Sequence, residues 1–280
     1  RFQEIYGYEL GVPKDWLQIY ALAEFFTRPN KNLYGIAYWP GKTYDGVTMG
    51  FQQVMWSWGG SYGNPKTYQI EGILNSKEGI EALEFYKSLM QFAPPGSEDY
   101  YWNECLTAFE QGLVAIGLHW ASWLDALASP ETNPFAEVTG YFAPPGHLCT
   151  DGKYRRYITV GGQGFSVSNY SKHKEESLKF IKWWAKKEAQ RKFMELGGIP
   201  ILTELLNSPD FLKAKPYNKA VAEALPLLRD FWTVPEYAKL MDITQEYWSA
   251  VTVGKYTPKE AMDIIAQKHT EVFREAGYYR

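Results

Sequence analysis

The stretch AFEQGLVAIGLHW, residues 108–120, joins three features that together indicate the fold. Its first residues continue an amphipathic segment that predicts a helix over about 102–111, and Gly112 is a residue type at which helices commonly end. The short apolar run 113–118 then predicts a strand. Trp120 follows that strand directly, and ligands of open α/β sheets bind beyond the carboxyl ends of the strands.

The rest of the chain alternates in the same manner between helical and short extended segments. Helices are predicted over about 13–27, 45–58, 76–90, 174–197, 235–253 and 258–276, and further strands over 33–39, 138–142, 157–160 and 165–167. The last helix has the clearest start, because residues 257–260 (TPKE) form a capping box with proline at the first helical position. Helices that alternate with strands predict an α/β fold.

Composition narrows the class of protein. The chain has 280 residues with a formal net charge of −3, and its basic residues are mixed with acidic ones, so no nucleic-acid footprint is present. Its longest apolar runs are too short to cross a bilayer. Aromatic residues reach 17%, and such rings line small-molecule pockets, although most of them are expected in the core.

The motifs of common enzymes are missing. The four histidines do not occur at H-x-x-x-H spacing, and neither a G-x-S-x-G elbow nor a phosphate-binding G-x-x-x-x-G-K-[ST] loop occurs. We therefore expect no catalytic residue, no cofactor and no metal. Cys105 and Cys149 are compatible with one disulfide in an oxidising compartment or with two buried thiols.

One acidic cluster leaves an enzymatic alternative open. Glu98, Asp99 and Glu104 lie among aromatic residues, and paired carboxylates beside aromatics are typical of glycosidases. The cluster also precedes a predicted helix, where the helix dipole favours acidic residues. We favour the second interpretation.

Four places have residues suited to binding a sugar, whose ring combines apolar faces with a polar rim. They are Tyr44 and Asp45 at a turn into a helix, Trp56 or Trp58 before a glycine pair, Trp120 after its strand, and Gly161, Gly162 and Gln163 in a flexible loop. An aspartate accepts hydroxyl hydrogen bonds strongly, and glycine lets a backbone approach a ligand closely. Each place also has a purely structural interpretation: Asp45 as a helix cap, the tryptophans as core, and the glycine loop as a crossover.

Several segments in this order resemble the extracellular solute-binding proteins of ABC sugar importers, the maltose-binding-protein-like group. They are VPKDW at 12–16, AFEQGLVAI at 108–116 with Trp120 after it, FAPPG at 142–146, GG at 161–162 with FSVS at 165–168, and TPKEAM at 257–262. In several members of the group the tryptophan corresponding to Trp120 stacks on sugar. Asp15 stands where threonine is common in the group.

The resemblance implies a type II periplasmic-binding-protein-like fold, with two α/β lobes around a cleft. By that likeness, residues 1–160 and 207–280 are the C-terminal lobe, and residues 161–206 cross the hinge and return to the N-terminal lobe. An N-terminal lobe that would precede residue 1 is expected as the packing partner of the returning segment. Trp232, in the second part of the C-terminal lobe, joins the candidate ligand contacts.

The implied protein is periplasmic or extracellular, with a lipid anchor as one option, and hands a sugar or oligosaccharide to ABC permease subunits. Three other functions stay open at this point: a fragment of a carbohydrate-active enzyme, a binding protein for a solute other than sugar, and a surface interaction protein that binds no solute.

Overall fold

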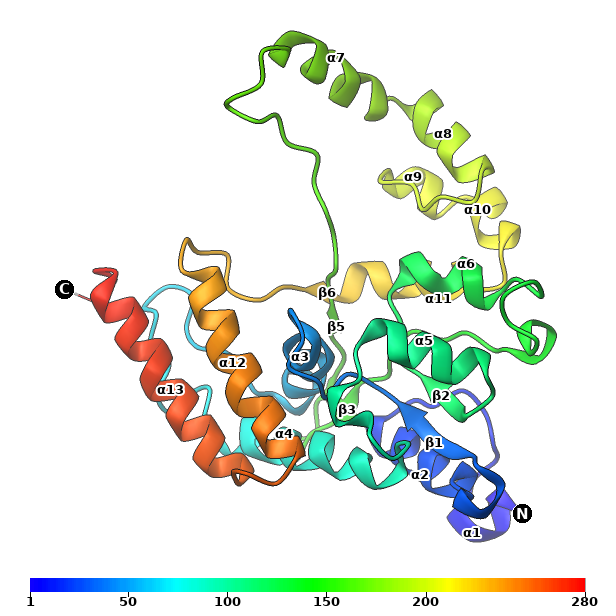
Figure 1. Cartoon of the computed structure of the whole chain (residues 1–280), viewed down its shortest axis with the longest axis vertical. Coiled ribbons are helices and arrows are strands. Elements are labelled where there is room, and N and C mark those ends of the chain that lie inside the picture. Colours follow the sequence, from blue (N-terminus) through cyan, green and yellow to red (C-terminus); the bar gives the residue numbers. More distant parts are fainter. Residues whose placement is uncertain (280) are drawn as a thin grey trace.

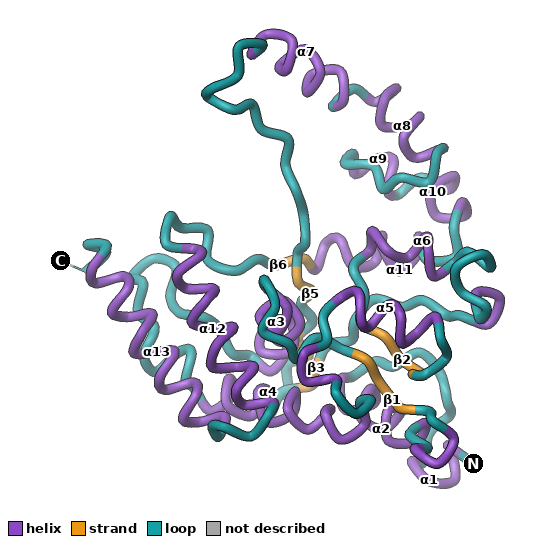
Figure 2. The backbone as a smooth tube through the Cα atoms, viewed as in Figure 1, coloured by secondary structure: helices purple, strands orange, loops and turns teal. Residues whose placement is uncertain are grey.

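The computed structural model describes residues 1–279 (Figure 1). Its α-helices are α1 (Phe2–Tyr6), α2 (Trp16–Phe26), α3 (Gly46–Trp58), α4 (Lys77–Ser88), α5 (Trp102–Glu110), α6 (Leu124–Leu127), α7 (Lys174–Trp184), α8 (Lys187–Glu195), α9 (Thr203–Leu206), α10 (Pro209–Ala214), α11 (Asn218–Ala224), α12 (Tyr237–Thr252) and α13 (Pro258–Glu275). Its strands are β1 (Tyr34–Ala37), β2 (Val114–Gly117), β3 (His147–Leu148), β4 (Tyr154–Arg155), β5 (Ile158–Thr159) and β6 (Leu228–Arg229). Figure 2 shows that helices dominate and that the strands are short. The predicted α/β class is confirmed.

The strands pair in three separate two-stranded ladders. β1 and β2 are parallel, with Ile36 opposite Ile116, and β5 and β6 are also parallel. β3 and β4 form a short antiparallel hairpin. Trp120 follows β2 along the chain, and Asp230 follows β6. The two parallel ladders therefore fix where these two residues lie.

Two predicted strands are wrong. Residues 136–138 form a turn of 3-10 helix, the rest of 138–142 has no regular structure, and Val138 is 83% exposed. Residues 165–167 are likewise irregular, and Phe165 is exposed. A strand needs a neighbour to satisfy its backbone groups, and no described strand pairs with either segment.

The core is built around α3. Every residue of this helix is buried, and α4, α12 and β5 pack around it. Phe51 meets Trp248 of α12 edge to face, with ring centroids 4.7 Å apart. The helix also buries four polar side chains, and each of them has a hydrogen-bond partner, as a buried polar group requires: Thr48, Gln52, Gln53 and Ser57.

Local signals set the ends of several helices as predicted. The Ser76 hydroxyl accepts from the Gly79 amide at the start of α4, and Thr257 and Glu260 form the predicted capping box of α13. Gly59 ends α3 in the left-handed conformation at φ 96°. No helix described within residues 1–279 combines the length and the apolar character that a membrane crossing requires.

After β5 the chain leaves this body as an arm. Figure 1 shows residues from about 160 running away to α7, and α8 to α10 leading back toward α11 and β6. The helix predicted over 174–197 is two helices, since α7 ends at Trp184 and α8 begins at Lys187. α7 has no buried residue. The predicted division of the chain at residue 161 coincides with the start of the arm, and its assignment to two lobes stays a prediction.

Candidate ligand-binding site

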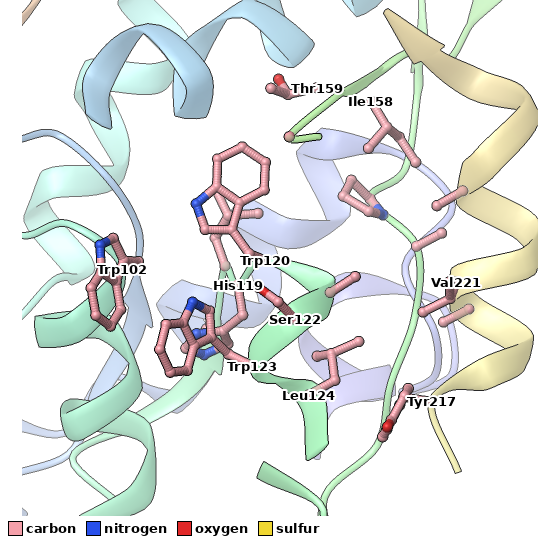
Figure 3. Close-up of a pocket in the computed structure, with 18 of the residues that line it drawn as sticks. Trp102, His119, Trp120, Ser122, Trp123, Leu124, Ile158, Thr159, Tyr217 and Val221 are labelled. Carbon is pink, nitrogen blue, oxygen red and sulfur yellow. The ribbon is translucent and has the colours of Figure 1, made fainter. Parts of the chain in front are cut away.

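A large cavity of ≈ 1720 Å³ lies between the ends of the parallel strands, the start of the arm and the α11 region. Tyr44, Asp45, Trp120, Gly161, Gly162 and Gln163, all predicted as ligand contacts, line it. Figure 3 shows Trp120 and Trp123 projecting from one short segment, with Trp102 facing Trp123 and Thr159 of β5 beyond Trp120. Its aromatic walls with few polar groups are typical of small-molecule sites.

Trp120 is held by two neighbours. Its ring leans on the buried Trp39 ring, with centroids 4.7 Å apart and planes at 38°. Gly161 lies so close that a Cβ on it would stand 2.3 Å from Trp120 Cζ3. The arm can therefore pass Trp120 only because residue 161 has no side chain. Trp120 and the first residue of the glycine loop are therefore in contact.

Tyr44 and Asp45 form the turn before α3. Tyr44 has φ 52° and is 82% exposed, and its carbonyl accepts from Gln245 Nε2 at 2.7 Å, which anchors the turn. Asp45 occupies the N-cap position of α3, but its side chain makes no capping hydrogen bond. Instead its Oδ1 accepts a short hydrogen bond from the Tyr101 hydroxyl. Burial raises the pKa of Asp45, although the Tyr101 hydrogen bond opposes the rise.

Asp230 and Tyr237 complete this end of the cavity, and both were missed in the sequence. Asp230 follows β6 directly, just as the residues around Trp120 follow β2. Burial raises the pKa of Tyr237 to about 12, and the charges of Asp45 and Asp230 add to the rise. Tyr237 and both carboxylates thus belong to the same cavity lining. The strand-end rule that selected Trp120 could have found Asp230 had the two-residue strand β6 been recognised.

A second aromatic group occupies the wall beside Trp120. Trp102 and Trp123 stack with centroids 4.5 Å apart and planes at 7°. Figure 3 places the His119 ring behind Trp123. Both His119 ring nitrogens are buried and have no hydrogen-bond partner among residues 1–279, and burial lowers the pKa of this imidazole to about 4.

The remaining tryptophans predicted as ligand contacts belong to the interior. Trp58 is 8% exposed and stacks on His147 at 3.9 Å, and Trp56 is 1% exposed. Trp232 is 8% exposed and packs edge to face on Phe273 at 5.1 Å. None of the three lines the cavity. Their assignment as contacts is corrected, because their rings fill the core around α3 and α13.

The two cysteines are free, so the possible disulfide is not formed. The Cys105 thiol donates to the Tyr38 carbonyl at 3.1 Å, and the Cys149 thiol donates to the Ser57 carbonyl at 3.2 Å. Each is buried in its own surroundings. No group of three or more potential metal ligands occurs among the residues that the structure describes.

One residue of the acidic cluster, Glu104, caps the start of α5. Glu104 Oε2 accepts from the Tyr101 amide at 3.1 Å, which is the reciprocal bond of a capping box. Glu98, Asp99 and Glu104 do not line the cavity. The helix-start interpretation of Glu104 is confirmed.

Comparison with known proteins identifies the family. Residues 4–191 match the profile described as bacterial extracellular solute-binding protein. A probable ABC transporter-binding protein of Deinococcus radiodurans is 25% identical over 220 residues, which are 76% of this chain and 50% of the relative. The maltotriose-binding protein of Pyrococcus abyssi is 26% identical over 264 residues, which are 92% of this chain and 54% of that protein. The chain thus spans about half the length of these curated relatives.

Solved structures support the same fold. A solute-binding protein of Agrobacterium radiobacter in complex with ribitol superposes with a TM-score of 0.80 at 24% identity, covering 97% of this chain and 67% of that one. Maltose-bound MalE3 of T. maritima also gives a TM-score of 0.80, at 21% identity, with 97% and 68% coverage. The fold is therefore that of type II periplasmic binding proteins, as the sequence predicted.

Proposed function

The chain belongs to the family of bacterial extracellular solute-binding proteins, and on that premise we propose that it captures a sugar or oligosaccharide for an ABC importer. The observation that carries the proposal is the position of Trp120. Its ring follows a strand end, lines the cavity and is held in contact with the Trp39 ring and with Gly161. An indole face held in this way is a stacking surface for the apolar face of a sugar ring.

Polar groups around Trp120 supply the rest of a saccharide site. Asp45 accepts hydroxyl hydrogen bonds, and Gln163 and the Gly161–Gly162 backbone both donate and accept them. Tyr44 offers a second exposed ring at the same end. Of the relatives named above, one is a maltotriose-binding protein, and two have structures with ribitol or maltose bound. These three compounds are all rich in hydroxyl groups. In this role the protein binds without making or breaking a covalent bond.

A titration tests the proposal. Maltotriose, maltose and ribitol are titrated calorimetrically into the chain and into Trp120→Ala, and the variant should bind at least about tenfold more weakly if the ring is a central anchor. Trp183→Ala is the matched control, because Trp183 is exposed on α7 and does not line the cavity. Unchanged affinity in Trp120→Ala would remove Trp120 from the site. A thermal-shift screen over amines and peptides tests the non-sugar alternative.

The proposed partners follow from the arm. Leu178, Phe180 and Trp183 of α7 are between 47% and 51% exposed, which is unusual for three apolar side chains on one short helix. We propose that a second lobe packs against α7 in the complete binding protein and covers these side chains, and that ABC permease subunits receive the solute. The family is described as extracellular, which supports a periplasmic or extracellular location. Attachment through a lipid anchor is part of the same proposal.

A further inference from the structure

The charged side chains that line the cavity are all acidic. Asp45, Asp125 and Asp230 are among the described lining residues, and no lysine or arginine is. Asp125 is neutralised by Lys215, whose Nζ lies 2.6 Å from Asp125 Oδ1. Asp45 and Asp230 form no ion pair within residues 1–279. Asp45 and Asp230 therefore give the cavity wall negative charge that no salt bridge of the described residues neutralises. The neighbouring cation, Arg229, lies over the Trp56 and Tyr157 rings and does not line the cavity.

Among the described lining residues, His119 is the side chain that could carry a positive charge near neutral pH, but it does not offset the charge of the carboxylates. Burial lowers the pKa of His119 to about 4, so its ring is uncharged at pH 7. An anion that enters the cavity thus meets no cation in the part of the wall that the structure describes. It also loses its hydration, and burying an unpaired charge is strongly unfavourable.

Aromatic faces strengthen the same preference. Tyr44, Tyr101, Trp120 and Tyr237 share the cavity lining with Asp45 and Asp230, and the Tyr101 side chain contacts Asp45 directly. The faces of such rings attract cations and repel anions. The Tyr101 hydroxyl is already used, because it donates to Asp45. The arrangement offers carboxylate acceptors to hydroxyl and ammonium groups, and no lysine or arginine of the described lining can pair with a carboxylate ligand.

We infer that the cavity selects saccharides by charge: neutral and amine-bearing saccharides bind, and saccharides with carboxylate, sulfate or phosphate groups are rejected. The inference rests on the proposed saccharide function and refines its substrate class. Asp45 and Asp230 act as the selecting residues, by repulsion of anions and by direct acceptance from donors.

The test compares saccharides of matched size. Maltotriose and cellotriose are each titrated as the neutral sugar, as the uronic acid and as the 2-amino-2-deoxy derivative at pH 7. The uronic acid should bind at least about tenfold more weakly than the neutral sugar, which corresponds to one unscreened charge contact across a partly buried site. The amine should bind as well as the neutral sugar or better, and its advantage should shrink in 0.5 M salt, a condition of about 4 Å screening length.

Variants assign the effect to the two carboxylates. Asp45→Asn with Asp230→Asn should bring the affinity for the uronic acid to within about threefold of that for the neutral sugar. Asp230→Asn alone serves if the double variant does not fold. Asp242→Asn is the matched control, since Asp242 is exposed on α12 and lies outside the cavity, and it should leave the ratio unchanged.

The outcomes separate this inference from the function on which it rests. Equal binding of the uronic acid and the neutral sugar, or an unchanged ratio in the asparagine variants, overturns charge selection and leaves the saccharide function standing. Failure of every saccharide to bind overturns both.

Discussion

Gly161→Ala should displace Trp120 and weaken saccharide binding. Gly161 is not in the left-handed region, so alanine is conformationally acceptable and the effect comes from contact alone. The new Cβ would stand 2.3, 2.7 and 2.8 Å from Cζ3, Cε3 and Cη2 of Trp120. Ordinary carbon contacts begin at about 3.5 Å, so ring or arm must move by about 1.2 Å. The Trp39 ring, 4.7 Å away, limits retreat of the indole on one side.

The expected cost has two parts. Overpacking of this kind destabilises a protein by about 1–3 kcal/mol, unless the arm moves away freely. Displacement of a central aromatic anchor should also weaken binding by about tenfold. The first part is measured by urea unfolding and the second by calorimetric titration with maltotriose. A change in tryptophan fluorescence should accompany both, because the surroundings of Trp120 change.

Gly162→Ala provides the matched control. A Cβ on Gly162 would have Val160 Cγ2 at 4.0 Å as its nearest neighbour, which is comfortable contact. Stability and fluorescence should therefore stay close to those of the unmodified chain. The double variant Gly161→Ala with Trp120→Phe removes the clashing atoms and should regain most of the lost stability. If Gly161→Ala and Gly162→Ala behave alike in unfolding, fluorescence and binding, the contact between the arm and Trp120 is not as described.

Three further perturbations probe single groups. Burial raises the pKa of Asp45 above its ordinary 3.8, so the charged form is less favourable in the folded chain than in the unfolded chain. Asp45→Asn should therefore raise the melting temperature at pH 7, by no more than about 2 °C. Melting curves near pH 3.5 should show no difference between the variant and the parent. Burial lowers the pKa values of His119 and His269 from 6.5 to about 4, so the stability of the fold should fall as pH drops from 6.5 toward 4. His119→Phe should recover about 1 kcal/mol of that loss in urea unfolding at pH 5. An equal loss in the variant and the parent would show that His119 does not cause it. Glu104→Ala should cost about 0.5–2 kcal/mol of stability in the same assay, because the cap of α5 is lost. Glu104→Gln keeps a hydrogen-bond acceptor and should keep most of the stability. If the parent hydrolyses aryl glycosides and Glu104→Gln does not, the enzymatic alternative is supported instead.

Helix positions could be predicted from the sequence because their determinants are local. Ser76 and the residues 257–260 satisfy the first amides of α4 and α13 with their own side chains, and Gly59 supplies the left-handed residue after α3. Strands lack such local determinants. The segment 165–167 has suitable residues for a strand, but a strand forms only where another backbone lies beside it.

The candidate site was partly predictable for a similar reason. Trp120 follows a recognisable strand, and Gly161 belongs to a glycine run, so each could be selected from its immediate neighbours. Trp58 and Trp232 could not be excluded in this way, because an aromatic residue in a helix or loop has the same local sequence whether it faces a cavity or the core. Asp230 and Tyr237 reach the same cavity as Asp45 only through the pairing of β5 with β6 and the packing of α12 on α3.

The contact between Gly161 and Trp120 would connect saccharide binding to rotation of the arm. The arm begins at the residue that touches the proposed stacking ring, so any rotation of the arm about the end of β5 changes the space over that ring. In a two-lobe binding protein, the segment that crosses between lobes absorbs the hinge motion. A saccharide on Trp120 would then contact the moving segment at its first residue, and closure would be favoured by the difference in contacts between the open and closed positions. Gly161→Ala should therefore weaken saccharide binding more when a partner lobe is present and closes on the ligand than in the isolated chain. Titrations of the variant and the parent with and without the partner lobe measure that difference.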